Sequence, residues 1–188
     1  MKQRKIGKRL LPKLAPIALS VGLAVAAIAP AEVFAASTAD QQAHQVWGWG
    51  AGRIVGTFET TDGKIGPCGM EPTQPVGNML TFHAGGTVTE SPQFPPAGAP
   101  GVFGLPGVFT RNIGLGTWSY NPHTNHYSMH LQYYFFEDGE FYGRGTVDRD
   151  IVLSADGKTA SGPVESIVYA ADGSVIVDLC GTATSTRL

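Results

Sequence analysis

The sequence predicts an all-β protein with the architecture of an eight-stranded antiparallel up-and-down β-barrel. Three Asp-Gly dipeptides divide the last third of the chain, namely Asp138-Gly139, Asp156-Gly157 and Asp172-Gly173. Asp-Gly favours tight hairpin turns because the central residues of such turns need a positive φ. The stretches between the dipeptides are rich in Tyr, Phe, Val, Ile and Thr, and each is long enough for one long strand. No segment shows a clear amphipathic helical period.

Turn signals and β-rich composition define the eight strands in order. The first strand is expected to end at Asp62-Gly63, and Gly85-Gly86 is expected to form the hairpin between the second and third strands. Gly143 and Gly145 lie inside the sixth strand, where a barrel needs a bulge or a sharp coil. The predicted strands are residues 53–61, 79–84, 87–91, 115–121, 126–136, 140–153, 158–170 and 174–187.

Residues 92–114 interrupt this pattern with five prolines and five glycines. That composition disfavours both a helix and a central strand. Apolar side chains such as Phe94, Val102 and Phe109 nevertheless indicate more than a linker. Three interpretations stay open: a loop folded over the barrel mouth, a contact between subunits in a homo-oligomer, or a segment without fixed structure.

Residues 1–35 have the layout of a secretory signal peptide. Six Lys and Arg residues precede an apolar stretch over residues 14–28, and Val33-Phe34-Ala35 resembles a cleavage site. The apolar stretch is shorter than the roughly 20 residues that a membrane-spanning helix needs, so no stable membrane anchor is expected. The sequence therefore predicts a secreted or periplasmic protein with a leader over residues 36–50 and a single barrel domain over residues 51–188.

Removal of the signal peptide changes the charge of the chain. The whole sequence has a formal net charge of −2, but the 153 residues after position 35 hold seven basic and fourteen acidic residues, which gives −7. Such an acidic chain without basic clusters does not suit the phosphate backbone of nucleic acids. Nucleic-acid binding is therefore not expected.

Cys68 and Cys180 are the two cysteines of the chain. In an oxidising compartment, an isolated pair most simply forms one disulfide. The bridge would bring the first strand region beside the last strand, as a closed barrel requires. Two free thiols or a catalytic cysteine remain the alternatives.

Several local motifs resemble those of known barrel proteins. Gly56-Thr57-Phe58 and Arg187 resemble the calycin-like barrels, which include the lipocalins, and this resemblance implies that Arg187 stacks on Phe58. The chain is more similar to small exported bacterial barrel proteins, with which it shares Leu80-Thr81-Phe82, Gly85-Gly86-Thr87 and Gly116-Thr117-Trp118. The allene oxide cyclase type is a similar short barrel, and its likeness implies a cofactor-free cyclase or isomerase.

The histidines of the fifth strand do not indicate a metal site. His126 and His130 lie about 13 Å apart along an extended strand, which is too far to share one zinc ion. They alternate with an apolar face, so we expect them to point outward unless a bulge reverses the strand. No hydrolase, zincin or phosphate-binding motif is present, and no metal or cofactor is predicted. The apolar face consists of Tyr127, Met129, Leu131, Tyr133 and Phe135.

Arg149 is the most informative charged residue, because it shares a strand face with Val147, Ile151 and Leu153. A guanidinium among apolar neighbours must pair or bind an anionic group. Glu165 in the seventh strand is the expected partner, which would make Arg149 structural. Alternatively, Arg149 lies at the barrel rim or anchors the carbonyl or carboxylate of a ligand.

Three functional hypotheses follow. In the first, the barrel binds a small, mainly apolar molecule. In the second, it is a cofactor-independent isomerase or cyclase that acts on a small carbonyl-containing substrate, and Arg149, Glu165 and Tyr133 are the catalytic candidates. In the third, it is a structural protein with a filled barrel. Whether the protein is an enzyme stays open, and the predicted ligand-binding residues are Trp118, Tyr127, Tyr133 and Arg149.

Overall fold

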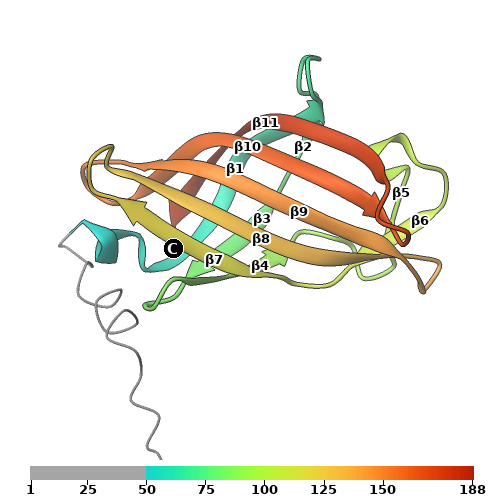
Figure 1. Cartoon of the computed structure of the whole chain (residues 1–188), viewed down its shortest axis with the longest axis horizontal. Helices are drawn as coiled ribbons and strands as arrows, with labels where there is room; N and C mark the ends of the chain where they lie inside the picture. Colours follow the sequence, from blue (N-terminus) through green and yellow to red (C-terminus); the bar gives the residue numbers. More distant parts are fainter. Residues whose placement is uncertain (1–49) are drawn as a thin grey trace, which may run out of the picture. The chain divides into compact units, whose positions relative to one another are not determined.

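Eight antiparallel strands form a closed barrel in the computed structural model, which describes residues 50–188 (Figure 1). The predicted signal peptide and the predicted leader up to residue 49 lie outside the described residues. The barrel strands are β1 (Gly56–Pro67), β3 (Asn78–Phe82), β4 (Thr87–Pro92), β7 (Gly114–Asn121), β8 (His126–Glu137), β9 (Glu140–Leu153), β10 (Thr159–Ala170) and β11 (Val175–Arg187).

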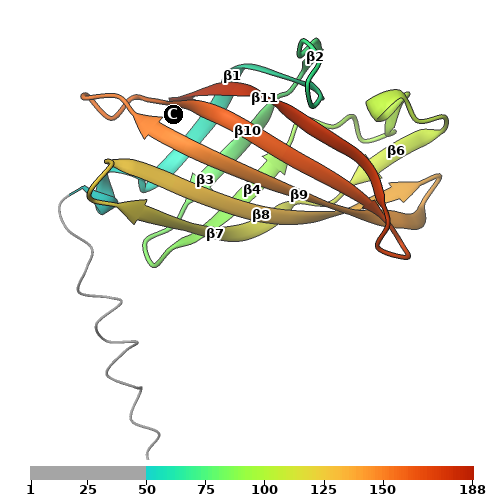
Figure 2. The ribbon, with the colours of Figure 1, turned by 45° about the horizontal axis from the view of Figure 1, so that its top comes forward.

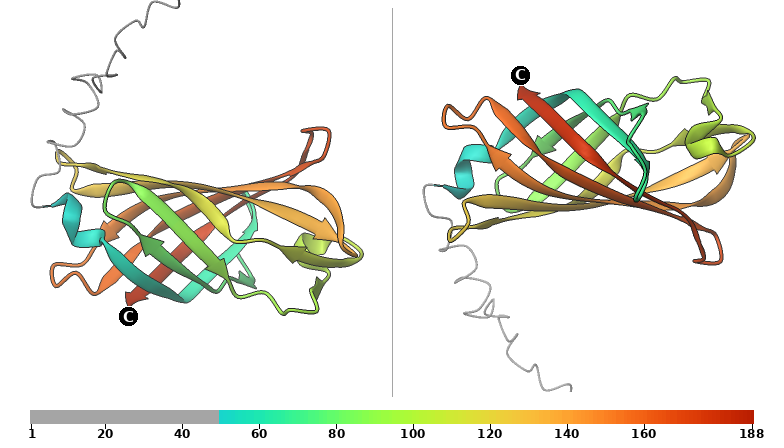
Figure 3. Two further views of the ribbon diagram at one scale, coloured as in Figure 1. Left: turned by 90° about the horizontal axis from the view of Figure 1, so that it is seen from below. Right: turned by 90° about the horizontal axis from the view of Figure 1, so that it is seen from above.

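The connectivity is the predicted up-and-down meander. Each barrel strand pairs antiparallel with the next one along the chain, and β1 pairs with β11 to close the sheet. Figures 2 and 3 show the strands running obliquely around the barrel, as closure of a twisted sheet demands. The predicted fold class is therefore confirmed.

The Asp-Gly dipeptides of the last third are turns, as predicted. Asp138 and Gly139 both have a positive φ, of 48° and 87°. Asp62-Gly63 is different, because β1 continues through it to Pro67 and pairs Gly63 with Ala183 of β11. The predicted end of the first strand is therefore wrong. An irregularity in the pairing between Thr60 and Asp62 absorbs the extra residue without ending the strand.

The segment over residues 92–114 is ordered more than its composition suggests. It contains two short strands, β5 (Ala99–Pro100) and β6 (Val108–Arg111), and a 3₁₀ helix η2 (Val102–Gly104). Strand β6 pairs with β5 and with the end of β8, beyond the part of β8 that pairs with β7. Neither strand is one of the eight barrel strands, and both form because the overhanging end of β8 offers free backbone groups. The segment lies at one end of the barrel (Figure 1), and its Val102 and Phe109 belong to the core.

The opposite end of the barrel is closed by packed aromatic rings. The 3₁₀ helix η1 (Ala51–Ile54) lies at this end, near the C-terminus of the chain (Figure 1). Arg187 stacks on Phe58 with its guanidinium carbon 4.4 Å from the ring centre, as the resemblance implied. Its Nε and Nη1 donate to the carbonyls of Gly157 and Val55 at 2.8 Å, and its Nη2 donates to the carbonyl of Arg53.

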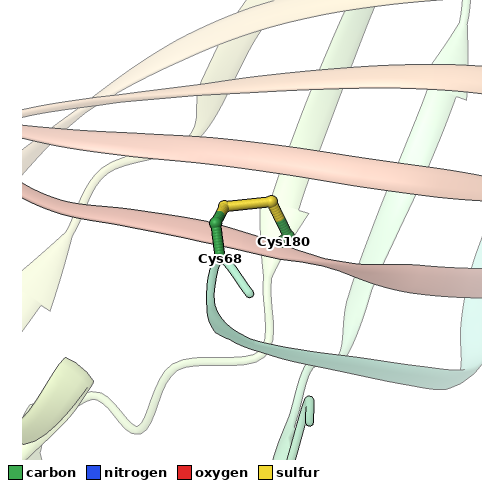
Figure 4. The surroundings of a disulfide bond; sticks show 2 residues. All are labelled: Cys68 and Cys180. Carbon is green, nitrogen blue, oxygen red and sulfur yellow. A yellow bond between two sulfur atoms is a disulfide. The ribbon is translucent and has the colours of Figure 1, made fainter. Parts of the chain in front are cut away.

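A disulfide joins Cys68 to Cys180, as predicted (Figure 4). Cys68 directly follows β1 and Cys180 lies in β11, with a Cα–Cα distance of 4.8 Å. The backbone N–H of Cys68 also donates to the carbonyl of Asp178 at 3.1 Å. Arg187 and the disulfide thus hold the β1–β11 seam at two separate points. The short strand β2 (Gln74–Pro75) pairs back onto β1 after the connecting turn.

Candidate ligand-binding site

A cavity of about 130 Å³ lies inside the barrel. It is lined by side chains from strands on several sides, and it reaches the surface at the exposed residues Pro75 and Gln93. The lining combines a charged cluster with an apolar wall. The apolar members include Ile65, Met129, Leu131, Phe135, Val147 and Val164.

Glu90 and Arg111 form an ion pair in this lining. Glu90 projects from β4 into the barrel and has only 3% of its side chain exposed, whereas Arg111 reaches in from β6 with 9% exposed. Asn78 of β3 donates to the second oxygen of Glu90 at 2.8 Å. Both carboxylate oxygens of Glu90 therefore have a partner, and this carboxylate is fully engaged within the protein.

Arg149 lies in the same lining but has only neutral partners. It is 5% exposed, and it donates from Nη2 to the carbonyl of Ala183 at 3.1 Å and from Nη1 to Oγ of Ser185 at 3.3 Å. Its Nε makes no hydrogen bond. Burial lowers the pKa of Arg149 to about 10, while the charge of Glu90 acts in the opposite direction. The side chain is therefore still protonated at neutral pH.

Tyr133 contacts both parts of the lining. Its ring lies under the guanidinium of Arg111, whose carbon is 3.4 Å from the ring centre. Gly145 of β9 pairs directly with Tyr133, and a Cβ at this glycine would overlap the ring. Glycine at this position therefore lets Tyr133 lie flat against β9. Burial raises the pKa of Tyr133, and the nearby Arg111 partly offsets the shift.

The predicted ligand-binding residues do not all lie at the cavity. Tyr133 and Arg149 line the cavity, whereas Trp118 and Tyr127 pack among the rings of the closed end and are not part of its lining. Glu165 is exposed on the outer face of β10, opposite Asp148, so it does not meet Arg149 inside the barrel. The expected Arg149–Glu165 partnership is therefore wrong.

The alternation of buried and exposed residues along β10 explains why the expected Arg149–Glu165 pairing is wrong. The buried residues of this strand are Ala160, Val164, Ser166 and Val168, and Val164 pairs directly with Arg149. Directly paired residues of neighbouring strands lie on the same face of a sheet. Glu165 must therefore point to the other face.

The histidines of β8 point outward, as predicted. His130 lies 2.8 Å from a carboxylate oxygen of Asp148, and His126 lies 3.0 Å from one of Asp150. Both pairs are on the exposed face of the β8–β9 ladder. Within residues 50–188, one group could offer three metal ligands, namely Cys68, Cys180 and Asp178, but the disulfide occupies both sulfur atoms.

Sequence reasoning missed the ion pair. The alternation of Val88 and Glu90 places both on one strand face, so the pattern alone could have indicated a buried Glu90. Arg111 gave no such signal, because it lies in the Pro/Gly-rich segment and enters the barrel only through the pairing of β6 with β8.

The lining thus presents a cationic part and an apolar part to the cavity. No protein-family model, curated protein or solved structure matches the chain. No helix within the described residues is both long enough and apolar enough to cross a membrane.

Proposed function

We propose that the protein is an exported, calycin-like barrel that binds a small, mainly apolar molecule in the cavity lined by Tyr133 and Arg149. The observation that carries the proposal is the cavity itself, which leaves about 130 Å³ in an interior of otherwise packed side chains. Cores normally fill such space, because unfilled volume costs stability. Export is supported by the layout of residues 1–35 and fits the Cys68–Cys180 disulfide.

The size of the cavity limits the ligand. Drug-sized ligands occupy pockets of roughly 300 Å³ or more, whereas an engineered apolar cavity of about 150 Å³ accepts benzene. The ligand, or the part of it that enters the barrel, is therefore about the size of one ring or a short branched chain. The small volume is also the observation that favours a filled, purely structural barrel as the alternative.

The position of Glu165 weakens the case for an isomerase or cyclase. That hypothesis relied on Glu165 for proton transfer inside the barrel, and its side chain lies on the outer face. Glu90 is the carboxylate that lines the cavity, but Arg111 and Asn78 engage both of its oxygens. The geometry therefore favours binding over proton transfer.

Binding of a simple apolar probe tests the proposal. Toluene added to the isotopically labelled exported protein should shift the methyl resonances of Leu131 and Val164, which line the cavity. Ala183→Leu fills the cavity from β11 and should abolish the shifts, whereas Thr182→Leu, on the exposed side of the same strand, should leave them unchanged. Absence of toluene-induced shifts in the wild-type protein, or their persistence in a folded Ala183→Leu protein, would contradict the proposal.

A further inference from the structure

The charges inside the barrel do not balance. Within the described residues, the cavity lining contains two guanidinium groups, those of Arg111 and Arg149, and a single carboxylate, that of Glu90. Arg111 and Glu90 neutralise each other through their ion pair. The interior is therefore left with one net positive charge, and Arg149 carries it.

Burial makes this charge costly. A charge taken out of water loses several kcal/mol of hydration unless an opposite charge and hydrogen bonds replace it. The two acceptors of Arg149, a carbonyl and a hydroxyl, are neutral, and Arg149 takes part in none of the ion pairs found within residues 50–188.

The nearest strand neighbours do not supply the missing charge. Asp148 and Asp150 flank Arg149 in β9, and because side chains alternate along a strand, both point to the outer face. There they face His130 and His126. Glu165 is also exposed on that face.

We propose that the ligand of this cavity is a small monocarboxylate, whose anionic group is held by Arg149 beside Arg111 and whose hydrocarbon part contacts the apolar wall. This inference rests on the proposed function and adds the chemical class of the ligand. A single negative charge is what the interior lacks, so a monoanion fits better than a phosphate dianion. The planar fork of a guanidinium also matches a carboxylate.

The unbalanced positive charge of Arg149 predicts selectivity for acids over their amides. A carboxylate replaces the lost hydration of Arg149 with a charge-assisted hydrogen bond, whereas the matching amide offers an acceptor oxygen but leaves the charge of the guanidinium without an opposite charge. Sites built in this way reject the analogue that lacks the matching group by large factors. We therefore expect each acid to bind at least about tenfold tighter than its own amide.

The experiment is a calorimetric titration of the exported protein with three acids of increasing size. Acetate, isobutyrate and benzoate are each compared with the matching amide, in a buffer with sulfate as the only inorganic anion and again with added chloride. At least one acid should bind about tenfold or more tighter than its amide. Equal affinity of every acid and its amide would overturn the inference, and so would a chloride affinity equal to that of the best acid.

Two variants test whether Arg149 is the arginine that causes the preference for the acid. Arg149→Met should remove the preference for the acid and retain toluene binding, which also shows that the cavity still forms. The matched control is Arg144→Met, because Arg144 is an exposed arginine of the same strand that stacks on Tyr169. It should bind the acid like the wild type. An undiminished preference for the acid in Arg149→Met would overturn the assignment.

The two proposals fail separately. If toluene binds and no acid is preferred, the cavity is a binding site for neutral molecules and only the inference of a carboxylate falls. If toluene does not bind to the wild-type protein, the proposed function falls, and the inference that rests on it falls with it.

Discussion

Arg187 at the closed end and Arg149 at the cavity show two uses of the same side chain in one barrel. All three guanidinium nitrogens of Arg187 donate to backbone carbonyls, and its flat face covers Phe58. Arg149 is more deeply buried, yet it has two neutral acceptors and an Nε without a partner. The comparison indicates that Arg187 stabilises the fold, whereas Arg149 is buried at a cost that its neutral partners do not offset and that the proposed ligand would offset.

The surroundings of Arg187 are also more densely packed than those of Arg149. The closed end is a continuous series of ring contacts from Phe58 through Phe82 and Trp118 to Tyr127, with centre-to-centre distances between 5.8 and 6.2 Å. The cavity half is lined partly by polar side chains and holds unfilled volume. Dense packing and full hydrogen bonding thus occur together at one end, and neither is complete at the other.

The largest effect is expected from the ion pair of the cavity half. Glu90→Gln removes the charge that Arg111 pairs with and leaves a second unpaired guanidinium inside the barrel. Such a change typically costs about 3 to 5 kcal/mol of unfolding free energy. Urea denaturation measures it, with the exposed Glu165→Gln as a control that should stay within about 0.5 kcal/mol of the wild type. A loss below about 1 kcal/mol for Glu90→Gln would show that the pair is not essential to the interior.

A smaller effect is expected from the glycine that accommodates Tyr133. In Gly145→Ala, the new Cβ would overlap the ring of Tyr133 and force it away from β9 into the cavity. Overpacking of this kind typically costs about 1 to 3 kcal/mol. It should also weaken toluene binding. Gly52→Ala, at the closed end, is the control, because nothing lies near the added Cβ. Unchanged toluene binding in Gly145→Ala would show that Tyr133 does not take part in the proposed binding site.

The smallest expected effect on stability comes from two turns in which an aspartate carboxylate accepts a hydrogen bond from a serine hydroxyl. Oδ1 of Asp156 accepts a hydrogen bond from the hydroxyl of Ser154, and Oδ1 of Asp172 accepts one from the hydroxyl of Ser174. These bonds hold the pKa of both carboxyls below the usual 3.8. Because the folded-state pKa is depressed, the turns stabilise the protein above the unfolded-state pKa, and the stabilisation is lost as the pH falls through the folded-state pKa.

Carboxyl titration by NMR should therefore give midpoints below 3.8 for both residues, and Ser154→Ala should raise the midpoint of Asp156 alone. A midpoint of Asp156 that does not move in Ser154→Ala would remove the hydroxyl as the cause. The two turns would then differ in what lowers the pKa of their carboxyls.

The sequence predicts the barrel well because the signals for its strands are local. Turn dipeptides and the alternation of residues 126–136 depend on neighbouring positions, and the structure keeps both. The position of Glu165 was not predictable in this way, because both faces of β10 contain β-branched or aromatic residues. Only its register against Arg149 decides which face points inward.

Arg111 marks the limit of such reasoning at the site. Its segment is rich in breakers of regular structure, and its entry into the cavity depends on a long-range pairing with the overhanging end of β8, which local signals do not reveal. Arg149 was predictable as an inward charge, whereas its lack of a charged partner was not. The inward position of Arg149 depends on the residue pattern of one strand. Its lack of a charged partner depends on the positions of all the carboxylates around it.

The most direct test of this account compares the unfolding free energies of Arg187→Met and Arg149→Met in urea. Arg187→Met should lose about 2 to 3 kcal/mol, because three backbone carbonyls lose their donor and Phe58 loses its cover. Arg149→Met should stay within about 1 kcal/mol of the wild type or exceed it, since an apolar side chain replaces a buried charge that has only neutral partners. A loss of about 3 kcal/mol or more in Arg149→Met would contradict the account, because Arg149 would then be as structural as Arg187.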